Sequence, residues 1–301
     1  MSRKGWLLFI AVSIFWGIPY LFIKIAVQEL DPSVVVFARA VIAATILIPM
    51  AVHARTILQL FRHWPTLLIF SLIHMFGSFL LISYGEQHLS SSLSSLLIAA
   101  NPLLVAVLAL GFDKSERVNG FRLLGLLVGL IGLIVLLGFD LRGDGQQWLG
   151  ALFILLAATG YAIGALMLKH EPLVKMSRVS VAAAECSITA ILLLPFTITR
   201  LPSSIPSPQV LVSLLILGLI CTALALPTFF ALIAEVGASR GSVITYINPA
   251  ISVLLGVTFL HEQFTIATVA GFLLIIGGSY LSTTGSLPFR AARKLPKSEV
   301  D

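Results

Sequence analysis

The chain has 301 residues, of which 58% are hydrophobic and only 11% are charged, and its mean hydropathy is +1.04. This composition excludes a water-soluble globular protein of this size and indicates a membrane protein. The net charge of +6 is explained by the loop charges described below, so no nucleic-acid partner is predicted.

Apolar runs long enough to cross a bilayer follow one another along the whole chain. A transmembrane helix needs about 20 apolar residues. The first run is interpreted as a retained span and not as a signal peptide, because it is long and no small-x-small cleavage site follows it. We predict ten spans, at residues 5–27, 33–53, 66–86, 93–111, 120–139, 148–169, 179–199, 209–234, 242–260 and 267–285.

Basic residues gather in every second loop of this arrangement. If the N-terminus is cytoplasmic, Lys24, Arg142 and Arg200 fall on the opposite side and Arg39 falls within a span, which leaves 15 of the 19 Lys and Arg residues on the cytoplasmic side. This is the positive-inside pattern, so both termini are predicted to be cytoplasmic. We predict that the last residues, 288–301, form a basic cytoplasmic tail. Its positive charges either act as the stop-transfer flank of the last span or contact anionic lipid.

The second half of the chain repeats the first. The pair Asn-Pro at 101–102 returns at 248–249, so that Pro249 lies 147 residues after Pro102, and WGIPYLFIK at 16–24 aligns with YAIGALMLK at 161–169. Such an internal match predicts a duplicated fold.

Each half holds five spans, an odd number, so the second half must enter the membrane with the opposite orientation. The predicted fold class is therefore an all-α polytopic membrane protein of ten transmembrane helices in two five-helix inverted-topology repeats. The first repeat covers 1–142 and the second 143–287. Inverted repeats are typical of secondary transporters, which work by alternating access.

These features together resemble the drug/metabolite transporter superfamily, EamA type. The resemblance rests on the Trp-Gly pair at 16–17, on YGEQHLSSSLSSLLIAANP at 84–102 with its counterpart GASRGSVITYINP, and on the short HEQ turn before the last helix. It covers nearly the whole chain. It implies export of amino acids or other small metabolites, or of toxic cations, across the bacterial inner membrane, without a cofactor. One departure is Tyr161-Ala162, where the first half has Trp16-Gly17.

The repeated Asn-Pro pairs predict two kinked helices. Pro102 and Pro249 lack an N–H and clash with the carbonyl four residues earlier, so backbone carbonyls are freed inside the membrane. Asn101 and Asn248 are placed to satisfy these carbonyls in a packed hinge, or to contact an amino or carboxyl group of a substrate. Both interpretations are open at this point.

Three ionisable residues lie within predicted spans, where such residues are costly and by default functional. Arg39 aligns with Glu185 in the repeat, but the two enter from opposite membrane faces, each about 9 Å deep at 1.5 Å per residue, so a direct salt bridge is not expected. His74 lies near mid-span, where it either carries a proton or packs with a hydrogen bond. Proton antiport through His74 or Glu185, facilitation and exchange are all compatible with the sequence.

Aromatic and hydroxyl side chains complete the candidate site. Trp16 and Tyr20 share a helix face, and deep aromatic residues either stack on a flat or cationic substrate or pack in the core. The serines near residue 94 allow close helix packing or form a polar stripe. The candidate substrate-binding or cavity residues are Trp16, Tyr20, Arg39, His74, Ser78, Ser94, Ser95, Asn101, Tyr161, Glu185, Tyr246 and Asn248, with Pro102 and Pro249 as helix kinks.

The sequence also argues against other functions. No GxxxxGK[ST] loop is present, and HEQFT at 261–265 is not the zinc motif HExxH. The alternative functions, of a different class, are an intramembrane enzyme built on His74, Ser78 and Glu185, or a receptor. Glycine ridges in the fifth and tenth spans suit internal helix contacts or a dimer face, so we expect a monomer or homodimer with a small-molecule substrate.

Overall fold

The computed structural model describes residues 2–112, 120–140, 145–237, 244–263 and 265–284, and in these ranges it is helical without strands. The helices of the first half are α1 (Arg3–Gly17), α2 (Pro19–Ala26), α3 (Pro32–His53), α4 (Leu58–Arg62), α5 (Trp64–Ser71), α6 (Ser78–His88), α7 (Ser91–Ile98), α8 (Asn101–Phe112) and α9 (Gly120–Asp140). Those of the second half are α10 (Gly145–Met167), α11 (Arg178–Ile198), α12 (Pro208–Leu215), α13 (Ala225–Val236), α15 (Ile244–Leu260) and α16 (Ile266–Thr284).

The predicted spans are confirmed. Among the described residues, 8 helical segments are long and apolar enough to cross a membrane, and two shorter apolar helices, Ile244–Leu260 and Ile266–Ser282, account for the ninth and tenth spans. The chain forms two compact units: Met1–Ala99 with Gly143–Phe264, and Ala100–Arg142 with Thr265–Asp301.

Two spans contain a π-helix that the sequence analysis did not predict. The third span continues from α5 through η1 (Leu72–Gly77) into α6, and the eighth from α12 through η3 (Ile216–Leu224) into α13. Leu72 and Gly218 are 146 residues apart, so the two π-helices lie at equivalent positions of the repeats. π-Helical turns inside α-helices are frequent at functional sites.

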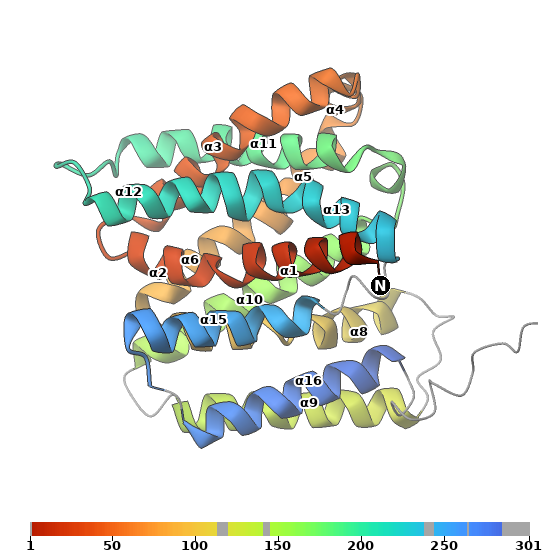
Figure 1. The fold of residues 1–301 in the computed structure, drawn as a ribbon, viewed down its shortest axis with the longest axis vertical. Coiled ribbons are helices and arrows are strands. Elements are labelled where there is room, and N and C mark those ends of the chain that lie inside the picture. The colour runs from red at the N-terminus through yellow and green to blue at the C-terminus, as the bar shows by residue number, and fades with distance from the viewer. Residues whose placement is uncertain (1, 113–119, 141–144, 238–243, 264, 285–301) are drawn as a thin grey trace, which may run out of the picture. The chain divides into compact units, whose positions relative to one another are not determined.

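In the first unit, the second span of each repeat packs against the other, as α3 and α11 (Figure 1). Their contact is made of small side chains, which let two helix backbones approach closely. The two helices are antiparallel, because Asp31 at the start of α3 contacts Arg200 just after the end of α11. The shared core cluster includes Ala40, Ala43, Ala44, Leu47, Ala51, Ala182, Ala183 and Cys186.

The second unit contains α8, α9 and α16, and Figure 1 shows α9 and α16 lying side by side. A Cβ added to Gly132 would lie 2.7 Å from the backbone nitrogen of Ile275, and one added to Gly271 would lie 3.0 Å from the carbonyl oxygen of Gly132. The expected internal contacts between the two glycine ridges are therefore confirmed.

The span that holds Pro102 is interrupted just before this residue. α7 ends at Ile98, a turn follows at 99–100, and α8 begins at Asn101, so Pro102 lies in the first turn of a new helix. The first helical turn tolerates proline because its N–H groups have no intrahelical acceptor. Pro249, by contrast, lies inside the continuous helix α15.

Candidate functional site

Arg39 and Glu185 occupy equivalent positions, each the seventh residue after the first residue of its helix, on α3 and α11. Both side chains are buried. Each contacts the π-helix of the other repeat: Arg39 Nε donates to Thr222 Oγ1 of η3 at 2.8 Å, and His74 Nδ1 of η1 lies 2.6 Å from Glu185 Oε1. As expected, no ion pair joins Arg39 to Glu185 in the described part of the chain.

The imidazole of His74 is held on several sides. Its ring stacks on Phe70 with centroids 5.0 Å apart and meets Tyr161 edge-on at 5.4 Å. A Cβ on Gly164 of α10 would collide with the ring, so only glycine leaves room for it there. The imidazole is therefore positioned to share a proton with the carboxylate of Glu185.

The guanidinium of Arg39 lies over the ring of Phe79, with its Cζ 4.1 Å from the ring centroid. Within the described ranges, its two terminal nitrogens have no hydrogen-bond acceptor, since only Nε is engaged. The ring of Phe79 in turn meets that of Tyr161 edge-on, with the centroids 6.2 Å apart. Tyr20, on α2, is half-buried. The contacts among the other residues define a group that we call the Arg39–Glu185 cluster, made of Arg39, His74, Phe79, Tyr161, Glu185 and Thr222.

Ser78 does not join His74 and Glu185 as a nucleophile. Its hydroxyl donates to the carbonyl oxygens of Ile73 and Ala157, both at 3.1 Å, and its side chain is buried. The acceptor five residues earlier is a carbonyl of the π-helix, in which hydrogen bonds join residues five apart and not four apart as in an α-helix. The arrangement expected of a serine hydrolase is therefore not assembled.

Trp16 and Asn248 form a second group on α1 and α15. The ring of Trp16 lies 4.7 Å from that of Phe229 and packs against an apolar cluster. With its amide nitrogen turned to the two carbonyls, Asn248 donates to Ser13 O at 3.2 Å and to Ile244 O at 3.0 Å. These contacts match the packed hinge that was one of the two interpretations.

The remaining candidates are more scattered. Ser94 and Ser95 are buried on α7, where the hydroxyl of Ser95 donates to the carbonyl of Ser92. Tyr246 is half-buried on α15. Asn101 belongs to the other compact unit, with α8.

The sequence analysis missed a polar group at the ends of α2, α6 and α7. Lys24 Nζ donates to the carbonyl oxygens of Glu86 at 2.6 Å and Leu89 at 2.7 Å. Glu262 accepts from the backbone nitrogens of Ser91 and Ser92 at the first turn of α7. These residues lie near the ends of spans, where charged residues commonly flank transmembrane helices and do not by themselves indicate a functional site. Their contacts, which the sequence does not reveal, distinguish them.

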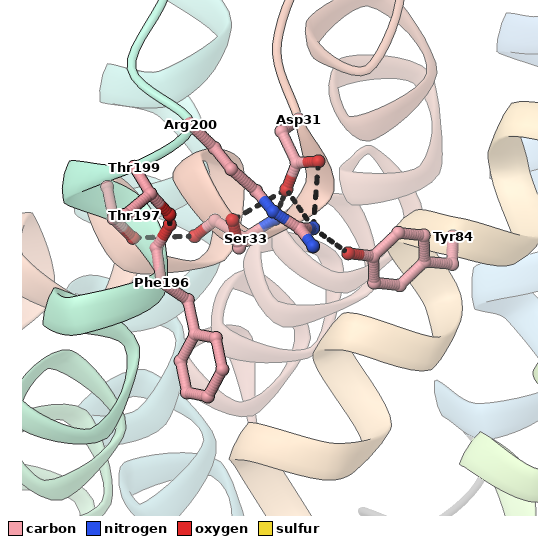
Figure 2. A network of polar contacts seen from close by, with 7 residues as sticks. All are labelled: Asp31, Ser33, Tyr84, Phe196, Thr197, Thr199 and Arg200. Atoms are coloured by element: carbon pink, nitrogen blue, oxygen red, sulfur yellow. Dashed lines mark hydrogen bonds and ion pairs between the residues drawn. The ribbon is translucent and has the colours of Figure 1, made fainter.

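Another network joins α3, α6 and α11 at the end where α3 begins (Figure 2). Arg200 Nη1 lies 3.1 Å from Asp31 Oδ2 and donates to the hydroxyl oxygen of Tyr84 at 2.7 Å. Asp31 also accepts from Ser33 N and so caps α3. The hydrogen bond to Tyr84 and the neighbouring carboxylate raise the pKa of Arg200.

No group of three or more His, Cys, Asp or Glu side chains suited to a metal ion occurs among the residues that the structure describes. The Arg39–Glu185 cluster offers one buried guanidinium, one carboxylate hydrogen-bonded to an imidazole, and aromatic rings beside them.

Comparison with known proteins gives a consistent result. The chain matches the model of the EamA-like transporter family over residues 3–138 and 148–284. The "Uncharacterized transporter YoaV" of Bacillus subtilis is 28% identical over 282 residues, which cover 91% of this chain and 94% of that protein. A "Probable amino-acid metabolite efflux pump" of Salmonella typhimurium is 27% identical over 304 residues, covering 97% and 99%.

A solved crystal structure has a TM-score of 0.67 to this chain at 22% identity, covering 99% of this chain and 100% of the other, and so shares the fold. Together with the apolar helices, the family match confirms the predicted fold class of ten transmembrane helices in two five-helix repeats.

Proposed function

Because the chain belongs to the EamA-like transporter family, whose members are multi-pass membrane transporters of small molecules and not enzymes, we propose that it exports amino acids or closely related metabolites by alternating access. Two relatives named as probable amino-acid metabolite efflux pumps, from Salmonella typhimurium and Escherichia coli, support this substrate class. We further propose that the repeats cover 1–142 and 143–287, and that the protein acts as a monomer or homodimer in the bacterial inner membrane with both termini cytoplasmic.

One observation carries the substrate proposal: the opposite charges of Arg39 and Glu185 in one buried cluster. An amino acid carries a carboxylate and an ammonium group a few ångströms apart. The terminal nitrogens of Arg39, which have no acceptor within the described part of the chain, match the carboxylate, since a guanidinium binds carboxylates with two parallel hydrogen bonds. The ammonium group is attracted by Glu185 and by the face of Tyr161.

The alternative is an exporter of toxic cations. The carboxylate of Glu185 and the aromatic rings of Phe79 and Tyr161 suit a cation, but the positive charge of Arg39 in the same cluster repels one. The two substrate classes therefore differ in what they require of Arg39.

The test is flux in proteoliposomes with a panel of labelled amino acids, a quaternary-ammonium dye, and a pH gradient imposed or collapsed. We expect saturable flux of amino acids that Arg39→Gln and Glu185→Gln each abolish. Arg62→Gln and Glu171→Gln are matched controls, because Arg62 and Glu171 are exposed. Flux of the dye that survives or increases in Arg39→Gln, without amino-acid flux in the wild type, would favour the cation exporter instead.

A further inference from the structure

We propose that Glu86, and not the pair His74–Glu185, is the group that binds and releases a proton during the transport cycle; this rests on the proposed transport function. The inference comes from a carboxyl group that is enclosed by the protein and has no partner in the described part of the chain.

Glu86 lies on α6, and its side chain is fully enclosed, with 0% exposure. Both of its carboxylate oxygens are buried, and neither has a hydrogen-bond donor among the described residues. This separates Glu86 from the other buried carboxylate, Glu185, whose oxygen lies 2.6 Å from the imidazole of His74. The carboxylate of Glu185 therefore has a hydrogen-bond partner, whereas the described residues offer the carboxylate of Glu86 none.

Two charged side chains near this end of α6, Lys24 and Glu262, are engaged by other groups. On α2, the ammonium of Lys24 donates to the backbone carbonyls of Glu86 and Leu89, and no ion pair joins it to the carboxylate of Glu86 in the ranges that the structure describes. After α15, the carboxylate of Glu262 is held by the first turn of α7.

The charged groups on α3 and η1 also have partners. Arg39 of α3 donates through Nε to Thr222 and lies over the ring of Phe79. His74 of η1 is hydrogen-bonded to Glu185. Among the described residues, neither side chain forms a hydrogen bond or ion pair with the carboxylate of Glu86, so the two repeat-related charges remain in their own cluster.

The other packed helices supply no counter-charge. α10, which packs closely on α6, has no Asp, Glu, Lys or Arg between Gly145 and Met167, and its titratable side chain is Tyr161. Tyr20 of α2 carries no positive charge. α7 contributes serines. On α6 itself, Tyr84 and His88 lie two residues away from Glu86 and therefore on other faces of the helix.

An unpaired carboxylate in such an environment costs far more than a neutral carboxylic acid. Glu86 is therefore protonated in this conformation. When the helices rearrange and admit water or the ammonium of Lys24 to the carboxyl group, the proton is released to the aqueous phase on that side. One proton binds and one leaves in each cycle, which couples transport to the proton gradient.

The first test does not depend on the substrate. Infrared spectra of the full-length protein in liposomes at neutral pH should contain the carbonyl stretch of a protonated carboxylic acid, shifted in D2O. Glu86→Gln should remove this band, whereas Glu185→Gln and the exposed control Glu171→Gln should keep it. Absence of the band in the wild type, its persistence in Glu86→Gln, or its loss in Glu185→Gln overturns the proposal.

The second test uses flux of the labelled amino-acid panel. Glu86→Gln should still transport, but the ratio of flux with and without an imposed pH gradient should fall to about one, whereas Glu171→Gln keeps the wild-type ratio. A normal gradient dependence in Glu86→Gln, or wild-type flux that ignores the gradient, overturns the coupling role. Absence of wild-type amino-acid flux overturns the proposed function, and the infrared band then still decides whether Glu86 holds a proton.

A neutral carboxyl group should tolerate neutral replacements. If Glu86→Gln and Glu86→Met both fail to fold while Glu171→Gln folds, the carboxylate has a structural role as an anion, and the proposal is wrong.

Discussion

Arg39 and Glu185 stand at the same position of two repeats and carry opposite charges. A duplicated fold would offer the same group twice if its halves had not diverged. The difference gives the cluster a positive and a negative side, as a substrate with an ammonium and a carboxylate requires. Each side chain is held by the π-helix of the opposite repeat.

The shape of the Arg39 side chain should matter as well as its charge. Arg39→Lys keeps the positive charge but loses the bond from Nε to Thr222 and the planar fork. A hydrogen bond to a charged group contributes about 1.5–3 kcal/mol, so we expect KM for amino acids to rise by roughly 10- to 100-fold. Flux kinetics in proteoliposomes measure this change, with Arg62→Lys as the control; an unchanged KM would remove Arg39 from substrate binding.

Gly164 should be needed for the position of His74. A Cβ in Gly164→Ala meets the imidazole ring, so the ring must move away from Glu185. Overpacking of this kind costs about 1–3 kcal/mol, and the melting temperature in detergent should fall together with flux. Gly277→Ala is the matched control, because nothing lies within 4 Å of its added Cβ. Equal melting temperatures for the two variants would contradict the expected clash.

At the residue scale, the sequence identified Arg39, His74 and Glu185 because a charge or an imidazole stands out in an apolar run. It did not identify Phe79 and Thr222 as partners of Arg39, since such contacts depend on the rotation of each helix about its axis. Each span has apolar residues on all of its faces, so the periodicity of the sequence does not show which face of a helix points into the protein.

The two π-helices are the elements that shape the cluster. Each π-helix has a side-chain hydroxyl that donates a hydrogen bond to one of its backbone carbonyls. Thr222 Oγ1, within η3, donates to Leu217 O at 2.8 Å, and the hydroxyl of Ser78, directly after η1, donates to Ile73 O. In both cases the acceptor lies five residues earlier. A hydroxyl thus satisfies a carbonyl that the wider turn leaves exposed inside the membrane.

Thr222 tests the role of this hydroxyl. Thr222→Val has the same shape but leaves Arg39 Nε and the carbonyl of Leu217 without their partner, at a cost of about 1–3 kcal/mol. Thr222→Ser keeps the hydroxyl and should keep most of the stability. Unfolding in detergent, followed by helical circular dichroism, distinguishes the two. Equal destabilisation by both variants would assign the effect to the lost methyl group and not to the hydrogen bond.

At the element scale, the spans were predictable because their length and apolar content are fixed by the bilayer. The π-helices were not, because one extra residue in a turn leaves no mark in a continuous apolar run. Pro102 was expected to kink a helix, and the span that holds it is interrupted just before this residue, between α7 and α8.

For the whole molecule, polar contacts join the two repeats at the end where α3 begins. Arg200 of the second repeat meets Asp31 of the first, and the backbone nitrogen of Ser207 donates to Glu29 at 2.8 Å. These contacts tie the ends of spans from both repeats in this conformation.

Glu29 should make this tie sensitive to acid. Hydrogen bonds from the side chain and the backbone of Ser207 lower the pKa of Glu29. A carboxyl group with a lowered pKa in the folded state stabilises the protein above its unfolded pKa, about 4.3, and this contribution is lost as the pH falls through the folded pKa. Melting temperatures measured across this acid range should fall less steeply in Glu29→Gln than in the wild type. Identical pH profiles would show that Glu29 does not contribute.

The alanine-rich contact between α3 and α11 has a geometric consequence. The small side chains at this contact let the two helix backbones approach closely. Arg39 lies toward one end of this antiparallel contact and Glu185 toward the other. We expect the packing distance between the two helices to set the gap between the guanidinium and the carboxylate, and with it the length of a substrate that fits between them.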